Sequence, residues 1–294
     1  MQQKERQIDG HTRLCGLIGN PVEHTMSPMI HNTLAQKEGR NLVYVPFHVE
    51  KGRIGEAVKG AFALNVLGLN VTVPYKSEVI GHLDGMDEMA EKIGAVNTLV
   101  RTDNGYKGYN TDVTGLYRAM CSEGIRLEGE EILILGAGGA ARAAAFLCAS
   151  KGAQKVYILN RTIEKAQGVA EEVNKAFRTG CVSAMCTGDY RKLGTGRKYL
   201  AIQATSVGLY PDTEKAVIME QDFYGMVHTG FDLIYKPFCT KFMSLVREAG
   251  GRAFHGLKML LYQGIEAYEL WNGAAVPEED ALALYRILLE SMET

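Results

Sequence analysis

The sequence predicts an α/β protein of two domains, the first of them built on a mostly parallel sheet. Three observations lead to this fold class. The chain has 294 residues, a length that favours two domains. In its first half, short apolar runs alternate with stretches of helical spacing, as in parallel βαβ units. The second half contains a further complete βαβ unit, which includes a glycine-rich turn.

The first half is interpreted as a regular series of strands and helices. Strands are predicted at residues 14–18, 43–47, 68–73 and 96–100, and helices at 28–38, 54–64, 86–93 and 111–123. The last of these helices can be capped by Thr111 or Asp112. Because it follows the first set of strands, we expect it to link the two domains.

The glycine-rich turn lies between an apolar strand and an alanine-rich helix, and a second apolar strand follows. Its residues, Gly136-Ala137-Gly138-Gly139-Ala140-Ala141, have the G-x-G-x-x-A form of the dinucleotide fingerprint. Gly136 allows the tight turn, Gly138 lets the backbone approach a pyrophosphate, and Ala141 lets the helix pack against the strand. The helix start offers N–H groups to the anion. A glycine-rich turn in another kind of α/β domain is the alternative interpretation.

The end of the second strand indicates which dinucleotide binds. An NAD site usually has an acidic residue there, which accepts a hydrogen bond from the ribose hydroxyl, whereas an arginine suits a 2′-phosphate. Here the strand ends at Asn160-Arg161-Thr162, with no acid beside Arg161. A guanidinium binds phosphate with two parallel hydrogen bonds. The sequence therefore predicts a Rossmann domain that binds NADP.

The rest of the chain is expected to complete the second domain and then return to the first. Strands are predicted near Val182 and at 199–203 and 230–234, and helices at 240–249, 257–271 and 277–292. The second sheet is complete before residue 256, so the last two helices are expected to fold back onto the first domain. We therefore predict a substrate domain of residues 1–112, completed by 257–294, and an NADP domain of residues 113–256.

The composition excludes several classes of protein. The chain is 46% hydrophobic and 22% charged with a net charge of −2, so no basic surface favours nucleic acid or an anionic membrane. We find no apolar run that could span a bilayer and no signal-peptide pattern in the polar first residues. The six cysteines are scattered without metal-ligand spacing. We expect a cytoplasmic protein with reduced thiols and no metal.

Polar side chains gather at the ends of the first-domain strands, where open α/β sheets bind ligands. Thr25 and Ser27 could present hydroxyls to a substrate, although spacing alone favours Ser27-Pro28 as an ordinary helix start. Lys76 follows a strand that also carries Thr72, and it could protonate a carbonyl oxygen. A solvated surface lysine is the alternative. Asn97 interrupts an apolar run, and Asp112 is either a helix cap or a carboxylate partner of Lys76.

Taken in order, these motifs resemble the shikimate dehydrogenase family over nearly the whole chain. They are residues 19–32, 70–76, 94–98, 108–112, 136–142, 160–162, 204–208, 232–237 and 256–263. The resemblance implies a substrate domain completed by the C-terminal helices, with an NADP domain between its two parts. It implies reversible reduction of 3-dehydroshikimate to shikimate by NADPH in the aromatic amino-acid (chorismate) pathway, as a monomer or homodimer.

The resemblance also implies roles for individual residues. Lys76 would be the catalytic acid and base, with Asp112 as its partner. The substrate would be held by Thr25, Ser27, Thr72, Asn97, Asp112 and Gln263, with Tyr235 near substrate and nicotinamide. The pyrophosphate would lie on Gly136, Ala137, Gly138, Gly139 and Ala140, and the 2′-phosphate end on Asn160, Arg161 and Thr162. The nicotinamide end would lie on Thr205, Val207, Leu233 and Gly256.

Three positions depart from the family pattern. Thr25 replaces a serine and adds a methyl group to the expected carboxylate pocket. Gln203 replaces an asparagine, which we expect to matter little, and Val113-Thr114 replaces small residues beside Asp112. Two alternatives stay open: a quinate/shikimate dehydrogenase with broader substrate or NAD use, and a dinucleotide-binding sensor without turnover. A sensor is expected to lack an acid/base group, whereas Lys76 is present.

Overall fold

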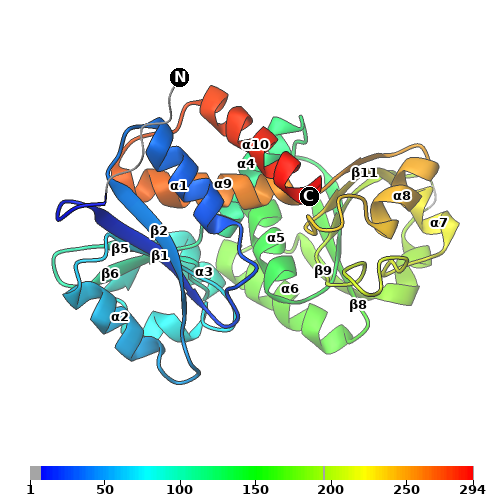
Figure 1. Ribbon diagram of the computed structural model, residues 1–294. Helices are drawn as coiled ribbons and strands as arrows, with labels where there is room; N and C mark the ends of the chain where they lie inside the picture. The colour runs from blue at the N-terminus through cyan, green and yellow to red at the C-terminus, as the bar shows by residue number, and fades with distance from the viewer. Residues whose placement is uncertain (1–7, 195, 294) are drawn as a thin grey trace. The chain divides into compact units, whose positions relative to one another are not determined.

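The computed structural model describes residues 8–194 and 196–293, and these form two compact units. The first unit contains the residues up to 115 and those from 261 onward, and the second contains residues 116–260. The boundaries fall inside two helices, α4 (Thr111–Ser122) and α9 (Leu257–Asn272) (Figure 1). The functional boundaries at 112 and 256 stay a prediction.

The first unit is built on a six-stranded sheet of order β2-β1-β3-β5-β6-β4. Its strands are β1 (Arg13–Gly19), β2 (Leu42–His48), β3 (Gly68–Val71), β4 (Gly85–Met86), β5 (Thr98–Arg101) and β6 (Tyr106–Tyr109). β1 pairs in parallel with β2 and β3, whereas β5 is antiparallel to β3 and β6. A connection as short as residues 102–105 can only join antiparallel neighbours. The mostly parallel sheet is confirmed, with this hairpin as its mixed part.

Helices connect and cover the strands of the first unit. They are α1 (Ser27–Lys37), α2 (Ile54–Ala63), the 3-10 helix η1 (Glu78–His82), α3 (Glu88–Ile93) and α10 (Glu278–Glu293). In Figure 1, α1 and α9 lie above this sheet and α2 lies below it. α2 packs its apolar face against the sheet, where Ile54 and Val58 join a cluster with Leu69 and Tyr106. The amphipathic spacing of the sequence therefore identified this helix correctly.

The C-terminal helices return to the first unit, as the sequence predicted. Trp271 on α9 is buried, and its Nε1 donates a hydrogen bond to the Leu99 carbonyl of β5 at 2.9 Å. The indole lies directly over Gly68 of β3, where an added Cβ atom would come 2.0 Å from Nε1. Tyr268 donates to the Glu38 carboxylate at 3.1 Å. Gly68 therefore leaves the space that the helix needs to dock.

The second unit contains a six-stranded sheet of order β12-β11-β10-β7-β8-β9, with every pair parallel. Its strands are β7 (Glu131–Leu135), β8 (Lys155–Asn160), β9 (Val182–Cys186), β10 (Tyr199–Gln203), β11 (Val227–Asp232) and β12 (Arg252–Phe254). The chain builds outward from β7 to β9 and then resumes beside β7 with β10. In such doubly wound sheets, ligands bind where the strand order reverses. The predicted Rossmann topology is confirmed.

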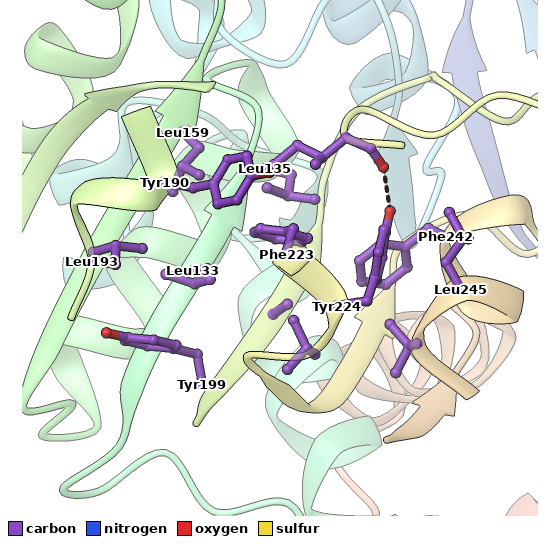
Figure 2. Packing of buried hydrophobic residues seen from close by; sticks show 14 of the residues in the cluster. Leu133, Leu135, Leu159, Tyr190, Leu193, Tyr199, Phe223, Tyr224, Phe242 and Leu245 are labelled. Atoms are coloured by element: carbon purple, nitrogen blue, oxygen red, sulfur yellow. Dashed lines mark hydrogen bonds between the residues drawn. The ribbon is translucent and has the colours of Figure 1, made fainter. Parts of the chain in front are cut away.

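The core of the second unit is rich in aromatic side chains (Figure 2). Its helices are α5 (Gly139–Ser150), α6 (Ile163–Phe177), the 3-10 helix η2 (Thr187–Lys192), α7 (Gln221–Tyr224) and α8 (Lys241–Glu248). Tyr190, Phe223, Tyr224 and Phe242 are almost fully buried in one cluster. The Tyr224 hydroxyl donates to the Ile218 carbonyl at 2.5 Å, which satisfies its polar end.

Membrane spans and clusters of metal-ligand side chains are both absent from residues 8–194 and 196–293. No helix there is long and apolar enough to cross a membrane. No group of three or more His, Cys, Asp or Glu side chains in that part of the chain could hold a metal ion.

Candidate functional site

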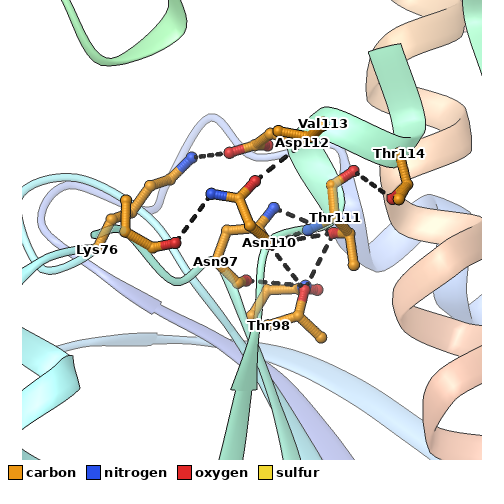
Figure 3. A network of polar contacts seen from close by, with 10 residues as sticks. Lys76, Asn97, Thr98, Asn110, Thr111, Asp112, Val113 and Thr114 are labelled. Atoms are coloured by element: carbon orange, nitrogen blue, oxygen red, sulfur yellow. Dashed lines mark hydrogen bonds and ion pairs between the residues drawn. The ribbon is translucent and has the colours of Figure 1, made fainter. Parts of the chain in front are cut away.

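Lys76 and Asp112 form an ion pair in the first unit (Figure 3). The Nζ atom lies 2.6 Å from Oδ2, and the side chains are 33% and 20% exposed, so solvent still reaches both groups. Lys76 lies shortly after β3, and Asp112 lies in the first turn of α4, where the helix dipole favours a carboxylate. Lys76 is therefore no isolated surface charge. Of the two readings of Asp112, the structure shows the lysine partner.

Two asparagines fasten the start of α4 and so place Asp112 (Figure 3). The buried Asn97 accepts a hydrogen bond from the Thr111 amide at 2.7 Å. Asn110 donates to the Ala95 carbonyl at 2.9 Å and accepts from the Val113 amide at 3.4 Å. Asn110, which lies in the 108–112 motif but was given no role of its own, therefore fills the capping role that Thr111 or Asp112 was expected to take.

A chain of neutral polar groups continues beneath the ion pair. The Tyr44 hydroxyl donates to the Asn70 amide oxygen at 2.8 Å, and Asn70 donates to the Thr98 hydroxyl at 3.0 Å. Thr98 lies 3.1 Å from the Thr111 hydroxyl. All four residues are buried, and burial raises the pKa of Tyr44 well above its ordinary value, so the phenol stays neutral. Tyr44 was missed because it lies in none of the motifs, and Thr98 was given no role although it lies in the 94–98 motif.

Thr25 and Ser27 lie together at the start of α1. The Thr25 hydroxyl donates to the Ser27 hydroxyl at 3.1 Å and accepts from the Ser27 amide at 3.2 Å. The expected role of Ser27 as a helix cap is wrong. Met26 occupies the cap position without a side-chain bond, and Ser27 is the first helical residue. The methyl group of Thr72 packs against Gly19 of the same loop, where an added Cβ would lie 2.3 Å away.

Gln263 on α9 lies close to the first turns of α4 because residue 115 of α4 is a glycine. A Cβ atom added to Gly115 would lie 2.5 Å from the Gln263 amide nitrogen, so the backbones of α4 and α9 touch there. Gly115 follows Val113-Thr114, the pair that departs from the family pattern. Val113 is buried, and the Thr114 hydroxyl donates to the Thr111 carbonyl at 3.3 Å. The close packing beside Asp112 therefore depends on Gly115.

The second unit has a cavity of about 350 Å³ at the switch point of its sheet. Its walls are formed by Gly136, Leu159, Asn160, Arg161, Thr187, Thr205, Ser206, Val207, Ala216 and Val217. Five of the predicted cofactor residues therefore come together, from segments that follow β7, β8 and β10. Thr187, which follows β9, was not predicted. Its hydroxyl is buried and has no partner among the described residues.

The glycine-rich turn has the geometry that an anion site needs. Gly136 has a φ of +113°, and an added Cβ would lie 2.8 Å from the Thr205 methyl group, so only glycine fits. Gly138 caps α5, and a Cβ there would meet nothing within 4 Å. The predicted residues Ala137, Gly139 and Ala140 are exposed or half-buried, whereas Ala141 is fully buried against the sheet.

The residues predicted to hold the 2′-phosphate lie at the end of β8. Asn160 donates to the Thr162 carbonyl at 2.8 Å and so shapes the turn after the strand. Arg161 is exposed, and its guanidinium has no ion pair with another described residue. A free guanidinium at this position suits a phosphate group.

The loop after β11 carries the other predicted residues of this unit. Asp232 is buried at its start, where it accepts bonds from the Ile234 amide at 2.9 Å and the Thr240 hydroxyl at 2.5 Å. A Cβ on Gly256 would lie 2.2 Å from the Leu233 carbonyl oxygen, so these segments touch. Burial raises the pKa of Tyr235. Leu233, Gly256 and Thr162 are not among the residues that line the cavity, and Tyr235 lies in a different unit from Lys76.

The buried Asp232 should make stability depend on pH. Burial raises its pKa from 3.8 to about 6, so between these values the folded protein holds a proton that the unfolded chain has lost. The free energy of unfolding should therefore fall as pH rises from 4 to 7, by about 3 kcal/mol from this group. Asp232→Asn should remove that contribution, as urea unfolding followed by circular dichroism would measure. The exposed Asp212→Asn is the control, and a wild-type minus Asp232→Asn difference that is flat with pH would contradict the assignment.

The fold and the two sites define a class. A doubly wound unit with a glycine turn and an exposed arginine after its second strand is typical of dinucleotide-binding proteins, and the first unit adds an ion pair between a lysine and a carboxylate. Residues 17–99 match the shikimate dehydrogenase substrate binding domain, 119–184 match shikimate / quinate 5-dehydrogenase, and 256–283 match the shikimate 5'-dehydrogenase C-terminal domain.

Individual relatives agree over nearly the full length. The chain is 38% identical over 286 residues to the shikimate dehydrogenase (NADP(+)) of Moorella thermoacetica, which covers 97% of this chain and 96% of that protein. A shikimate 5-dehydrogenase from Listeria monocytogenes, crystallised with shikimate and NAD, has a TM-score of 0.89 and 32% identity over 96% of this chain and 98% of that one. A shikimate dehydrogenase crystallised with NADP+ has a TM-score of 0.87 and 34% identity, with 96% and 97% covered. The chain belongs to the shikimate dehydrogenase family.

Proposed function

We propose that this chain catalyses the reversible, NADP-dependent reduction of 3-dehydroshikimate to shikimate. The observation that carries the proposal is the Lys76–Asp112 pair, held at 2.6 Å on a polar network that also contains Asn97. Family membership supplies the substrate class, because a relative of this fold was crystallised with shikimate. A sensor that had lost turnover would not need the pair.

The pair supplies the proton chemistry. When shikimate is oxidised, NADP+ accepts a hydride from the ring carbon and the hydroxyl on that carbon loses its proton. Lys76 and Asp112 receive this proton as a coupled unit, and in the reverse direction they return it to the carbonyl oxygen. The ammonium group also stabilises negative charge on that oxygen. We assign the ring hydroxyls to Thr72, Asn97 and Gln263, and the carboxylate to the paired hydroxyls of Thr25 and Ser27.

The residues of the second unit fit NADP. The turn of residues 136–140 offers backbone N–H groups and open space for the pyrophosphate. We assign the 2′-phosphate to Asn160, Arg161 and Thr162, and the nicotinamide end to Thr205, Val207, Leu233 and Gly256. The positive φ of Gly136 and the free guanidinium of Arg161 support these assignments.

Initial rates of the purified protein test the function directly. They should be measured with shikimate or quinate, each paired with NADP or NAD. Turnover with shikimate and NADP well above the other pairs is the expected result. Tight NADP binding without turnover in any pair would overturn the proposal in favour of a sensor.

Quinate oxidation is the second candidate. The model matched by residues 119–184 covers both shikimate and quinate enzymes, and the listeria relative was crystallised with NAD. Thr25 adds a methyl group beside Ser27, and a tighter pocket disfavours the extra ring hydroxyl of quinate. Comparable rates with the two substrates would favour this alternative.

Arg161→Gln should raise the KM for NADP by about 10- to 100-fold, because a charge-assisted bond to phosphate is lost. The KM for NAD, which lacks the phosphate, should change less than about twofold. Steady-state kinetics with both cofactors measures the effect. Arg126→Gln, at an exposed arginine of the same unit outside the cavity lining, is the control. Equal losses with both cofactors would contradict a phosphate role.

The expected partners are small molecules only, in a cytoplasmic monomer or homodimer. The cavity of the second unit and the mild net charge of −2 support the small-molecule part of this expectation. Light scattering at several protein concentrations distinguishes the two oligomeric states, and cell fractionation tests the compartment.

A further inference from the structure

Gln203 is the last residue of β10 and is fully buried. Its side chain turns back onto the segment that follows it, residues 204–207. Three residues of that segment, Thr205, Ser206 and Val207, line the cavity of the second unit. A replacement that looked minor in the sequence therefore lies directly behind the wall of the cofactor cavity.

The Gln203 amide makes four hydrogen bonds within this short turn. Its oxygen accepts from the Thr205 amide at 2.8 Å and from the Thr205 hydroxyl at 2.7 Å. Its nitrogen donates to the Val207 carbonyl at 3.0 Å and to the Thr205 carbonyl at 3.3 Å. A primary amide has two donor and two acceptor positions, so every position is occupied. Backbone groups of this turn thus form hydrogen bonds with one side chain, whereas backbone groups within the sheet form them with a neighbouring strand.

The same residue reaches two further segments of the predicted site. Its main-chain carbonyl accepts from the Leu233 amide at 2.9 Å, and Leu233 in turn packs against Gly256. The Thr205 methyl group lies against Gly136 in the glycine-rich turn. Gln203 therefore connects, directly or through one neighbour, all four residues assigned to the nicotinamide end.

We propose that Gln203 is a positioning residue that holds the turn of residues 204–207 and the Leu233 segment in place for the nicotinamide half of NADP. This inference rests on the proposed function. Gln203 is behind the cavity wall, so it acts through Thr205, Val207 and Leu233 and not by touching the cofactor. The adenosine half is assigned to Asn160 and Arg161. The Gln203 amide forms hydrogen bonds only with Thr205 and Val207 among the described residues, so the adenosine half should be unaffected by its loss.

The loss of Gln203 is therefore expected to weaken binding of the nicotinamide half and not of the adenosine half. A general structural role would weaken both, so the two roles can be distinguished. Gln203→Met keeps the length of the side chain but removes all four bonds, and Gln203→Glu keeps the accepting oxygen but places a carboxylate against two carbonyl groups. Binding of NADP and of adenosine 2′,5′-bisphosphate, which lacks the nicotinamide half, should be measured by calorimetry. In both variants the affinity for NADP should fall at least about tenfold, while that for the bisphosphate should change less than about twofold.

Shikimate oxidation in single-turnover experiments should slow at saturating NADP, because the nicotinamide ring is no longer held in one orientation. The exposed Gln154→Met is the matched control and should change neither ligand. Equal losses of NADP and bisphosphate affinity, or no loss in either variant, would overturn the role of Gln203. A wild-type protein that does not oxidise shikimate would instead overturn the proposed function, so the two failures are distinguishable.

Discussion

Replacing Lys76 with alanine should lower kcat for shikimate oxidation by about 10³-fold or more, because both proton transfer and stabilisation of the developing charge are lost. The affinity for shikimate should change far less, since the residues proposed to bind it are untouched, among them Thr25, Ser27, Asn97 and Gln263. Steady-state kinetics, with shikimate binding measured separately by calorimetry, checks both parts. A variant that keeps near-normal turnover would exclude Lys76 as the acid/base.

A second lysine in the same unit provides the control. Lys92 also forms a short ion pair, at 2.5 Å to Glu88, but on the surface of α3. Lys92→Ala removes the same atoms and charge and should leave kcat within about twofold, because exposed pairs contribute little. A large loss in both variants would indicate that general damage, and not the chemistry at Lys76, explains the effect.

Gly68→Ala should destabilise the first unit by about 2–4 kcal/mol, from overpacking and from loss of the bond between Trp271 and Leu99. The added methyl group would lie 2.0 Å from the indole nitrogen, and a rigid ring cannot move aside without undocking α9. Trp271 is the single tryptophan of the chain, so its fluorescence reports this contact. Urea unfolding should show a lower midpoint and red-shifted emission before unfolding.

The same substitution elsewhere in the unit should have the opposite effect. Gly60 lies within α2, and an added Cβ would meet nothing within 4 Å. Gly60→Ala should therefore stabilise the unit by about 0.5–1 kcal/mol through helix propensity. If Gly68→Ala behaved like Gly60→Ala, the docking of Trp271 over β3 would be wrong.

The elements that depend on local pattern could be predicted from the sequence. The helix of α2 follows from its spacing of apolar residues, and the βαβ unit around Gly136 from its apolar strands and glycines. Arg161 was identified because its position after β8 has a direct chemical meaning. The strands β4, β6 and β12 were missed, since runs of two to four residues carry too little periodicity. The start of α1 was predicted one residue late, at residue 28, because Met26 occupies the cap position without a side-chain bond and so gives no signal in the sequence.

The sequence by itself determined the fold class, the dinucleotide turn and the identity of the charged groups, because these depend on neighbours along the chain. Only the tertiary structure decided which groups these side chains bond to. Asp112 pairs with Lys76 while Asn110 takes over the cap, and 36 residues separate the two charges. Gln203 likewise gained its role only when β10 ended beside β7 and its amide met the backbone groups of Thr205 and Val207. Such roles depend on which backbone groups still need a hydrogen-bond partner in the folded chain, and only the fold determines which groups these are.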